Sequence, residues 1–421
     1  MQILWGLGGI AVLLGIAFLF STDRRAISPR TVGGALGIQV LFGVLVLYSD
    51  LGQRALETVA SGVQQVIDAS GEGIDFLFGP ALPEEGVLFA FQVLPVIVFF
   101  ASLTAVLYYL NILQWVVRIV GGALQKLLGT SQAESMSATA NIFVGQTEAP
   151  LIVRPFVSGM TRSELFAIMT GGLASVAGSV LVGYSLLGAQ LEYLIAAAFM
   201  AAPGGLLMAK MLMPETETRE TVDASATEIE SAGEAVADRE AAEAEEEGPR
   251  NVIDAAARGA LDGLRLALNV GAMLLAFISL IALLNLILGS LGGIFGFGEI
   301  TFQQILGFVF APVMFLIGVP WAEAVTAGGF LGQKLVLNEF VAFAEFGPAA
   351  EDGEFSEKAE AIITFALTGF ANFASIAILI GGIGGIAPDR RGQIAQLGLL
   401  AVLAGTLANL MSATIAGMLI G

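Results

Sequence analysis

The sequence contains no cysteine and no histidine among its 421 residues. These absences exclude disulfide bonds, thiolate nucleophiles, zinc sites of the Cys/His type and imidazole general bases. Charged residues are also scarce, at 13% of the chain, against about 25% in a soluble globular protein. With 56% apolar residues and a mean hydropathy of +0.84, the chain is that of a membrane protein. Any chemistry in it must use carboxylates, amides, hydroxyls and backbone groups.

The net charge of −19 is concentrated in one segment. Residues 214–250 hold 13 acidic residues against three arginines and no aromatic residue. Such a composition cannot bury enough apolar surface to fold alone, so we expect a disordered acidic loop in the cytoplasm. A docking site for a cytosolic protein is the alternative. The acidic balance disfavours nucleic acid as a partner.

Eight apolar runs are long enough to cross a bilayer, which takes roughly 20 helical residues. They cover residues 3–20, 31–48, 87–110, 165–187, 193–213, a run that ends near 288, 359–386 and 394–419. Between them we expect an outer surface helix around 56–66, amphipathic helices at 113–128 and 251–265, and an apolar surface helix at 302–317. Arginines at 24, 25, 30, 390 and 391 place their loops in the cytoplasm and both termini outside.

Two segments, 131–156 and 321–346, are too polar to be simple spans. The first holds Glu134 and Glu148, which are 14 residues apart, and the second holds Glu323 and Glu339, which are 16 apart. The two segments start from opposite sides of the membrane. This pattern predicts inverted repeats with re-entrant hairpins, as in secondary transporters.

The first hairpin contains an amide, a hydroxyl and a carboxylate in consecutive positions, Gln146, Thr147 and Glu148, between a glycine and a proline. Glycine and proline disfavour a helix, so a hairpin tip is expected. Ionisable groups inside a membrane are expensive and are functional candidates by default. The alternative is an acid that only caps a helix or lies at the interface.

The second hairpin contains Asn338 and Glu339, and here the alternative is a salt bridge between Glu339 and Lys334. Each hairpin precedes a span with a glycine-rich and hydroxyl-rich middle, at 171–180 and 368–375. Asn372 and Ser375 are three residues apart, so they face the same way on a helix or a partly unwound turn.

The runs 145–156, 338–340 and 369–372 resemble the signatures of the concentrative nucleoside transporter family. The resemblance covers nearly the whole chain after about residue 87, and only the acidic loop has no counterpart. It implies an all-α membrane protein, a homotrimer of protomers with eight transmembrane helices plus two re-entrant hairpins, divided into a scaffold and a mobile transport part. The expected units are three scaffold spans with the outer surface helix (1–112), the first repeat (113–213), the acidic loop (214–250), an interfacial helix with a sixth, scaffold span (251–300) and the second repeat (301–421).

The resemblance also implies a site. By similarity, the substrate contacts are Gln146, Thr147 and Glu148 on the nucleobase side, Glu339, Asn372 and Ser375 on the ribose hydroxyls, and Val180 and Phe370 packed on the base. A sodium ion, the only cofactor expected, would lie near Asn141, the Val144 carbonyl, Ser175 and the Val176 carbonyl. Carboxylate, amide and hydroxyl groups complement ribose hydroxyls, and an all-oxygen shell at a broken helix suits sodium.

We therefore expect a sodium-driven importer of nucleosides such as uridine in the lipid bilayer of a bacterial-type inner membrane, and not an enzyme. A first alternative is proton coupling through Glu148 or Glu339. A second is an intramembrane hydrolase that uses these two carboxylates as an acid/base pair. A third is a scaffold whose acidic loop recruits proteins.

Overall fold

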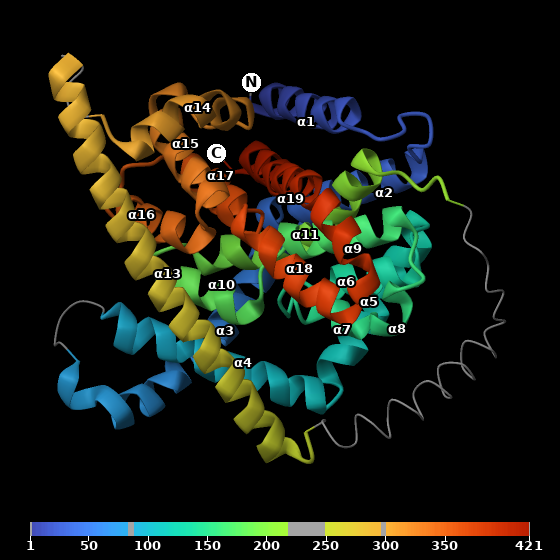
Figure 1. The fold of residues 1–421 in the computed structure, drawn as a ribbon, viewed down its shortest axis with the longest axis horizontal. Helices are drawn as coiled ribbons and strands as arrows, with labels where there is room; N and C mark the ends of the chain where they lie inside the picture. The colour runs from blue at the N-terminus through green and yellow to red at the C-terminus, as the bar shows by residue number, and fades with distance from the viewer. Residues whose placement is uncertain (1, 83–87, 218–248, 296–299, 421) are drawn as a thin grey trace.

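The computed structural model describes residues 2–82, 88–217, 249–295 and 300–420, with backbone only for 292–295. Helices form the fold in these ranges (Figure 1). The first half contains α1 (Gln2–Leu19), α2 (Pro29–Gly43), α3 (Asp50–Phe78), α4 (Leu94–Tyr109), α5 (Ile112–Leu128), α6 (Gln132–Ala140), α7 (Ala149–Ile152), α8 (Arg154–Val157), α9 (Arg162–Ala174), α10 (Gly178–Ser185) and α11 (Leu191–Leu212). The second half contains α13 (Val252–Phe295), α14 (Phe302–Leu316), α15 (Trp321–Val336), α16 (Glu339–Glu351), α17 (Glu357–Leu367), α18 (Ala374–Ile386) and α19 (Arg391–Leu419).

Seven helical segments of the described chain are long and apolar enough to cross a membrane, and an eighth arises if the bent pair α14 and α15 counts as one span. The angle between α14 and α15 is 117°. The prediction of an all-helical membrane protein with about eight spans is thereby confirmed. The span predicted at 359–386 is not one helix, however, because α17 ends at Leu367 and α18 begins only at Ala374.

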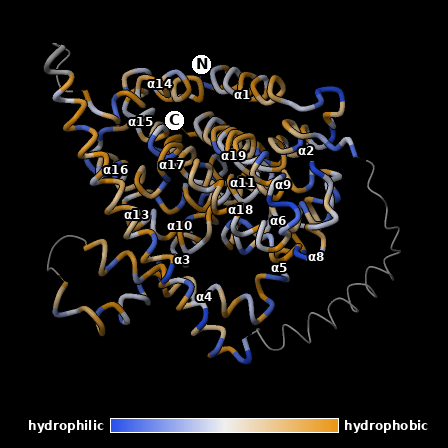
Figure 2. The backbone as a smooth tube through the Cα atoms, in the orientation of Figure 1, coloured by the Kyte–Doolittle hydropathy of each residue, from blue (hydrophilic) through white to orange (hydrophobic). Residues whose placement is uncertain are grey.

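The core of the bundle is built by α9, α10, α11 and α19. The apolar windows of Arg162–Leu186 and Leu191–Leu212 are each 94% buried, whereas that of α13 is 17% buried. Figure 2 shows hydrophobic stretches on the outer helices α1 and α13 as well as inside the bundle. A helix that is apolar on its exposed face as well as its packed face suits a lipid or subunit contact.

One end of the bundle, called here the first face, collects the loop after α1, the end of α5, the loop after α8 and the turn before α19. Arg30 Nη2 donates to Lys126 O at 2.7 Å, and Thr22 N donates to Leu212 O at 2.8 Å. On the same face, Arg390 Nη1 donates at 2.9 Å to the carbonyl oxygens of Ser158 and Met160. The unit α6 to α8 therefore enters and leaves at this face.

The opposite end, called the second face, holds the start of α15, the end of α16 and the start of α17. Glu323 Oε2 accepts from the backbone nitrogen and hydroxyl of Ser356, at 3.2 and 3.1 Å. Gln190, just before α11, donates to Glu360 at 2.7 Å. Since α11 runs from this face to the first, the two hairpins enter from opposite ends, as the sequence predicts.

Two elements differ in length from their predictions. The amphipathic stretch at 251–265 and the span that follows are one continuous helix, α13, of 44 residues (Figure 1). The surface helix expected around 56–66 extends over all of α3. The helices expected at 113–128 and 302–317 are observed as α5 and α14 within one residue of their predicted ends. Most of the acidic loop, 218–248, lies outside the described residues.

Candidate functional site

Each hairpin lies near a break in the span that follows it. The first break is residues 175–177, between α9 and α10, and the second is residues 368–373, between α17 and α18. A backbone hydrogen bond joins each hairpin to its break. Gly178 N, after the α9 break, donates to Phe143 O at 3.1 Å. Phe373 N, after the α17 break, donates to Leu335 O at 3.1 Å. The two broken spans thus supply free backbone groups that the hairpins satisfy, which is how irregular backbone is tolerated at membrane depth.

The two breaks also contact each other. Phe370 N donates to Ser175 O at 3.1 Å, so one residue of each break forms the link. Gly369 beside it has φ +149°, and a Cβ there would lie within 2.8 Å of the Asn409 side chain and Ala174 O. Only glycine allows the chain this conformation and this close an approach.

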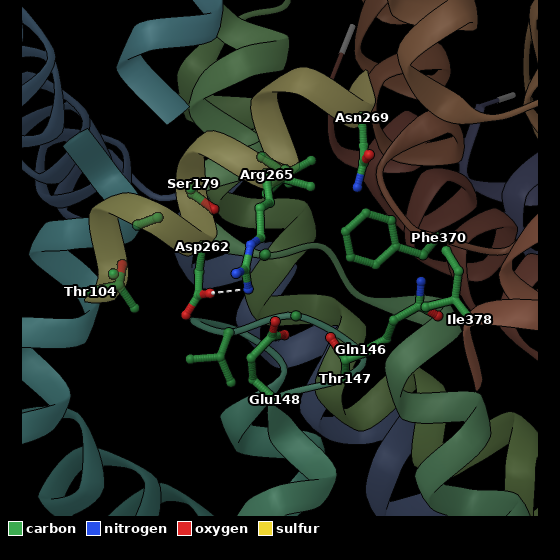
Figure 3. A pocket seen from close by; sticks show the side chains of 18 of the residues that line it. Thr104, Gln146, Thr147, Glu148, Ser179, Asp262, Arg265, Asn269, Phe370 and Ile378 are labelled. Carbon is green, nitrogen blue, oxygen red and sulfur yellow. Dashed lines mark ion pairs between the residues drawn. The ribbon is translucent and has the colours of Figure 1, made fainter. Parts of the chain in front are cut away.

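A cavity of about 840 Å³ lies where hairpins and breaks converge, within the range typical of small-molecule sites. All eight side chains predicted to contact substrate line it, and several are labelled in Figure 3. They come from the first hairpin tip (Gln146, Thr147, Glu148), from α10 (Val180), from the start of α16 (Glu339) and from the second break and α18 (Phe370, Asn372, Ser375). Glu148 and Glu339, from opposite faces of the bundle, therefore share one cavity.

On the second-hairpin side, the polar groups of the cavity are fixed by one another. Asn372 Nδ2 donates to Glu339 Oε2 at 3.0 Å, and Asn372 Oδ1 accepts from Ser375 N at 2.8 Å. Asn338 caps α16 by accepting from Val341 N at 3.0 Å. Glu339 stands in the first turn of α16, where the helix dipole favours a carboxylate. These groups are buried and held in place before any ligand arrives.

On the first-hairpin side, the polar groups of the cavity are less well satisfied by hydrogen bonds within the protein. Gln146 Nε2 lies 3.4 Å from Ser375 Oγ, a long contact that joins the first hairpin tip to the second break. Gln146 Oε1 is buried and has no partner among the described residues. Glu148 is exposed at the tip and points into the cavity in Figure 3. This side therefore presents polar atoms with free hydrogen-bonding capacity.

Beside the cavity, the residues predicted for an ion gather at the junction of the first hairpin and the α9 break. Asn141 Oδ1 and Ser175 Oγ are both buried, and neither has a partner among the described residues. The Asn141 amide nitrogen donates to Ser137 O at 2.9 Å. Of the two residues whose carbonyls are predicted ion ligands, Val144 lines the cavity and Val176 is buried. Unpaired buried oxygens are costly, and a cation would satisfy them.

Lys334 does not pair with Glu339, so that alternative is wrong. The Lys334 ammonium donates to Ala366 O at 2.7 Å and to Asn409 Oδ1 at 2.8 Å. Asn409 Nδ2 in turn donates to Ala174 O at 2.6 Å and Thr368 O at 2.8 Å. These two side chains therefore hold the carbonyl ends of α9 and α17, the helices that precede the breaks.

The remaining wall of the cavity comes from α4 and α13. Thr104 of α4 lines it, as do Asp262, Arg265 and Asn269 of α13 (Figure 3). Asp262 and Arg265 form an ion pair at 3.6 Å. The cavity therefore lies between the hairpins and a pair of outer helices that carries its own polar stripe.

Comparison with known proteins identifies the family. The model described as "Na+ dependent nucleoside transporter C-terminus" matches residues 193–417, its N-terminal counterpart matches 8–81, and a "Nucleoside recognition" model matches 90–191. The chain belongs to the Na+-dependent nucleoside transporter family. The resemblance seen in the sequence is thus confirmed, and the family is one of multi-pass membrane transporters, which rules out the enzyme alternative. Sodium is in this family a co-transported ion and not a resident cofactor.

The relatives cover the whole chain. The "Uncharacterized transporter YutK" of Bacillus subtilis (strain 168) is 56% identical, over 100% of both chains. "Nucleoside permease NupC" of Helicobacter pylori is 48% identical, over 99% of this chain and 98% of its own. Among solved structures, CNTnw in an inward-facing substrate-bound state is 52% identical, with a TM-score of 0.92 and coverage of 100% and 98%.

Reasoning from the sequence missed Asn409, Asn269 and Thr104. Asn409 carried a usable signal, because it is an uncharged amide in the middle of an apolar span, the same signal that singled out Asn372. Asn269 follows Asp262 and Arg265 at helical spacing, a polar stripe that also indicates a wall in a transporter. Thr104 carried no signal of its own.

Glu134, counted among the polar residues of the first hairpin, does not reach the cavity. It closes a capping box with Ser131 at the start of α6 and forms a buried ion pair with Lys210. Lys210 also donates to Ser163 Oγ at 2.8 Å. In this transporter Glu134 therefore ties α6, α9 and α11 together at the first face.

Proposed function

We propose that this chain is a sodium-coupled nucleoside symporter that imports nucleosides across a bacterial inner membrane. The observation that carries the proposal is the common cavity, to which both hairpins, α10, the second break and α18 contribute the side chains expected to contact a nucleoside. The family description supports the substrate class and the ion.

For the ribose, we assign Glu339, Asn372 and Ser375. Ribose hydroxyls both donate and accept, and a carboxylate makes a strong acceptor for them. The bond from Asn372 to Glu339 holds the carboxylate ready, so little side-chain entropy is lost when the sugar binds.

For the base, we assign Gln146, Thr147 and Glu148 to its polar edge, and Val180 and Phe370 to its apolar face. The unpaired Gln146 oxygen supports this, because a ring or exocyclic N–H of the base would satisfy it. Phe370 supplies an aromatic surface on which a base can stack.

For sodium, we assign Asn141, Ser175 and the carbonyls of Val144 and Val176. The unpaired buried oxygens of Asn141 and Ser175 support the site, and broken helices offer sodium such oxygen ligands. None of these groups titrates near neutral pH, which favours sodium over a proton.

For the transport cycle, we propose that the two repeats move as one part past a scaffold that includes α4 and α13, in a homotrimer with both chain termini outside. The cavity lies between the hairpins and the wall formed by α4 and α13, which supports such a division. In a transporter of this kind, the substrate site lies at the contact surface between the moving part and the scaffold. The arginines of the first face support a cytoplasmic location for that face. Structures of CNTnw in inward-facing, outward-facing and intermediate states belong to that protein and show what range of motion a similar chain has.

Uptake of labelled uridine into proteoliposomes tests the function. An inward sodium gradient should drive accumulation above equilibrium, and a pH gradient alone should not. Accumulation driven by the pH gradient in sodium-free buffer would favour proton coupling, and absence of uptake for every nucleoside in a panel would contradict the proposal.

A further inference from the structure

The two hairpin–break junctions are built alike. In each, a residue at the far end of a break donates to a carbonyl of its own hairpin at 3.1 Å. Gly178, the first residue of α10, donates to Phe143 O, and Phe373, the residue before α18, donates to Leu335 O. These two equivalent bonds align the hairpin of the first repeat with the hairpin of the second. Asn141 lies two residues before Phe143, and Lys334 lies one residue before Leu335, so both side chains start from the same stretch of their hairpins.

In the first repeat no cationic side chain in the described part of the chain is bonded to the oxygens of this junction. Asn141 Oδ1 and the Ser175 hydroxyl, at the end of α9, are buried oxygens with no partner among the described residues. In the second repeat two oxygens at the junction at the end of α17 have a cationic partner. Ala366 O and Asn409 Oδ1 both accept from the Lys334 ammonium. The two junctions therefore differ in one respect: at the second junction, the Lys334 side chain supplies a cation.

Lys334 has no carboxylate within ion-pair distance among the described residues, and Glu339 attracts its ammonium only from farther away. The Lys334 side chain is fully buried. A buried, unpaired charge is strongly destabilising unless something specific compensates for it. Here the compensation comes from carbonyl dipoles at the end of α17, where a positive charge is favoured.

We propose that Lys334 is a built-in cation that takes, in the second repeat, the place that sodium takes in the first. This inference rests on the proposed function and deepens it. The ammonium satisfies the carbonyl ends at the second break without a bound ion, so substrate binding at Glu339 and Asn372 needs an ion only at the first break. Through Asn409, which contacts both Ala174 O and Thr368 O, the same residue steadies both broken helices.

Removal of the ammonium tests the proposal. In Lys334→Ala the freed oxygens and the space of the side chain should form a second cation site. Uridine binding to the purified variant should then depend more steeply on sodium, with a Hill coefficient that rises from about 1 toward about 2. Alternatively, methylammonium should occupy the vacated space and restore the uridine affinity. A variant with the wild-type sodium dependence and no response to methylammonium would overturn the proposal.

Lys334→Met keeps most of the volume but removes the charge. It should bind uridine at least about tenfold more weakly, which corresponds to about 1.4 kcal/mol, and methylammonium should not restore it because the space is filled. Binding as tight as in the wild type would overturn the proposal. If Lys334→Ala unfolds during purification in sodium-free buffer, its thermal midpoint should rise when sodium or methylammonium is added, and a midpoint insensitive to both would count against the proposal.

Lys210→Met is the matched control, because Lys210 is also a buried lysine but pairs with Glu134. It should lower the thermal midpoint without a steeper sodium dependence or amine rescue. A response to methylammonium equal to that of Lys334→Ala would mean that the rescue is not specific to the second junction. Wild-type protein that takes up no nucleoside would refute the proposed function, whereas sodium-driven wild-type uptake with unresponsive Lys334 variants would refute only this inference.

Discussion

The Asn372 side-chain nitrogen lies 3.0 Å from Glu339 Oε2 and joins the second break to the first turn of α16. Asn372 is itself oriented by the bond from Ser375 N to its carbonyl oxygen. The carboxylate is thereby fixed and can still accept from a ligand, since a carboxylate accepts up to about four hydrogen bonds.

Glu339→Gln should weaken uridine binding by about 10- to 100-fold, because a charge-assisted hydrogen bond is worth about 1.5–3 kcal/mol. Isothermal titration at saturating sodium measures the loss. 2′,3′-Dideoxyuridine, which lacks both hydroxyls, should bind wild type and variant about equally. An equal loss for both ligands would contradict the ribose assignment.

Asn141→Ala should raise the sodium concentration for half-maximal uridine binding by about tenfold or more, because it removes one of the proposed oxygen ligands, and coupling makes uridine affinity follow the ion. At saturating sodium the uridine affinity should approach that of wild type. Thr406→Val is a suitable control, since within the described ranges the Thr406 hydroxyl donates only to Val402 O of its own helix. A uridine affinity that stays low at any sodium concentration would argue for a fold defect instead.

Gly263→Leu should destabilise the pair α4 and α13. A Cβ at Gly263 would lie 2.8 Å from Val98 Cα and 2.7 Å from Ala101 Cβ, and Gly259 is similarly close to Ala105. These glycines let the two helices pack closely, as small residues do in membranes, and overpacking costs about 1–3 kcal/mol. The thermal midpoint in detergent should fall, whereas Gly289→Leu, which meets nothing within 4 Å, should leave it unchanged.

Glu134→Gln should lower the stability by about 3–5 kcal/mol, because it leaves the buried Lys210 ammonium without its carboxylate. The double variant with Lys210→Met should recover part of the loss, as both charges are then gone. A double-mutant cycle on the unfolding free energy measures the coupling. Additive losses would show that the pair contributes no net interaction.

The sequence predicted the spans, the opposite hairpins and the polar residues of the hairpin tips, because each depends on local patterns of hydropathy, charge and glycine. The proposed base contacts Val180 and Phe370 and the residues predicted for the ion came only from the resemblance to the family. The sequence could not predict the partner of Lys334. A salt bridge with Glu339, five residues away, was the local solution, but the ammonium bonds to Ala366 O and Asn409 Oδ1, which are distant in the chain. The polar wall on α13 was missed for the same reason, since residues 251–265 alone indicate only an amphipathic helix, and which surface they face depends on tertiary packing.

The bond from Phe370 N to Ser175 O places a proposed ion ligand and a proposed base contact at the two ends of one hydrogen bond. A displacement of either residue that lengthens this bond must strain the other. The proposed ion and nucleoside sites can therefore affect each other directly, without a chain of contacts through the rest of the protein. Both binding events act on the same short segment of non-helical backbone.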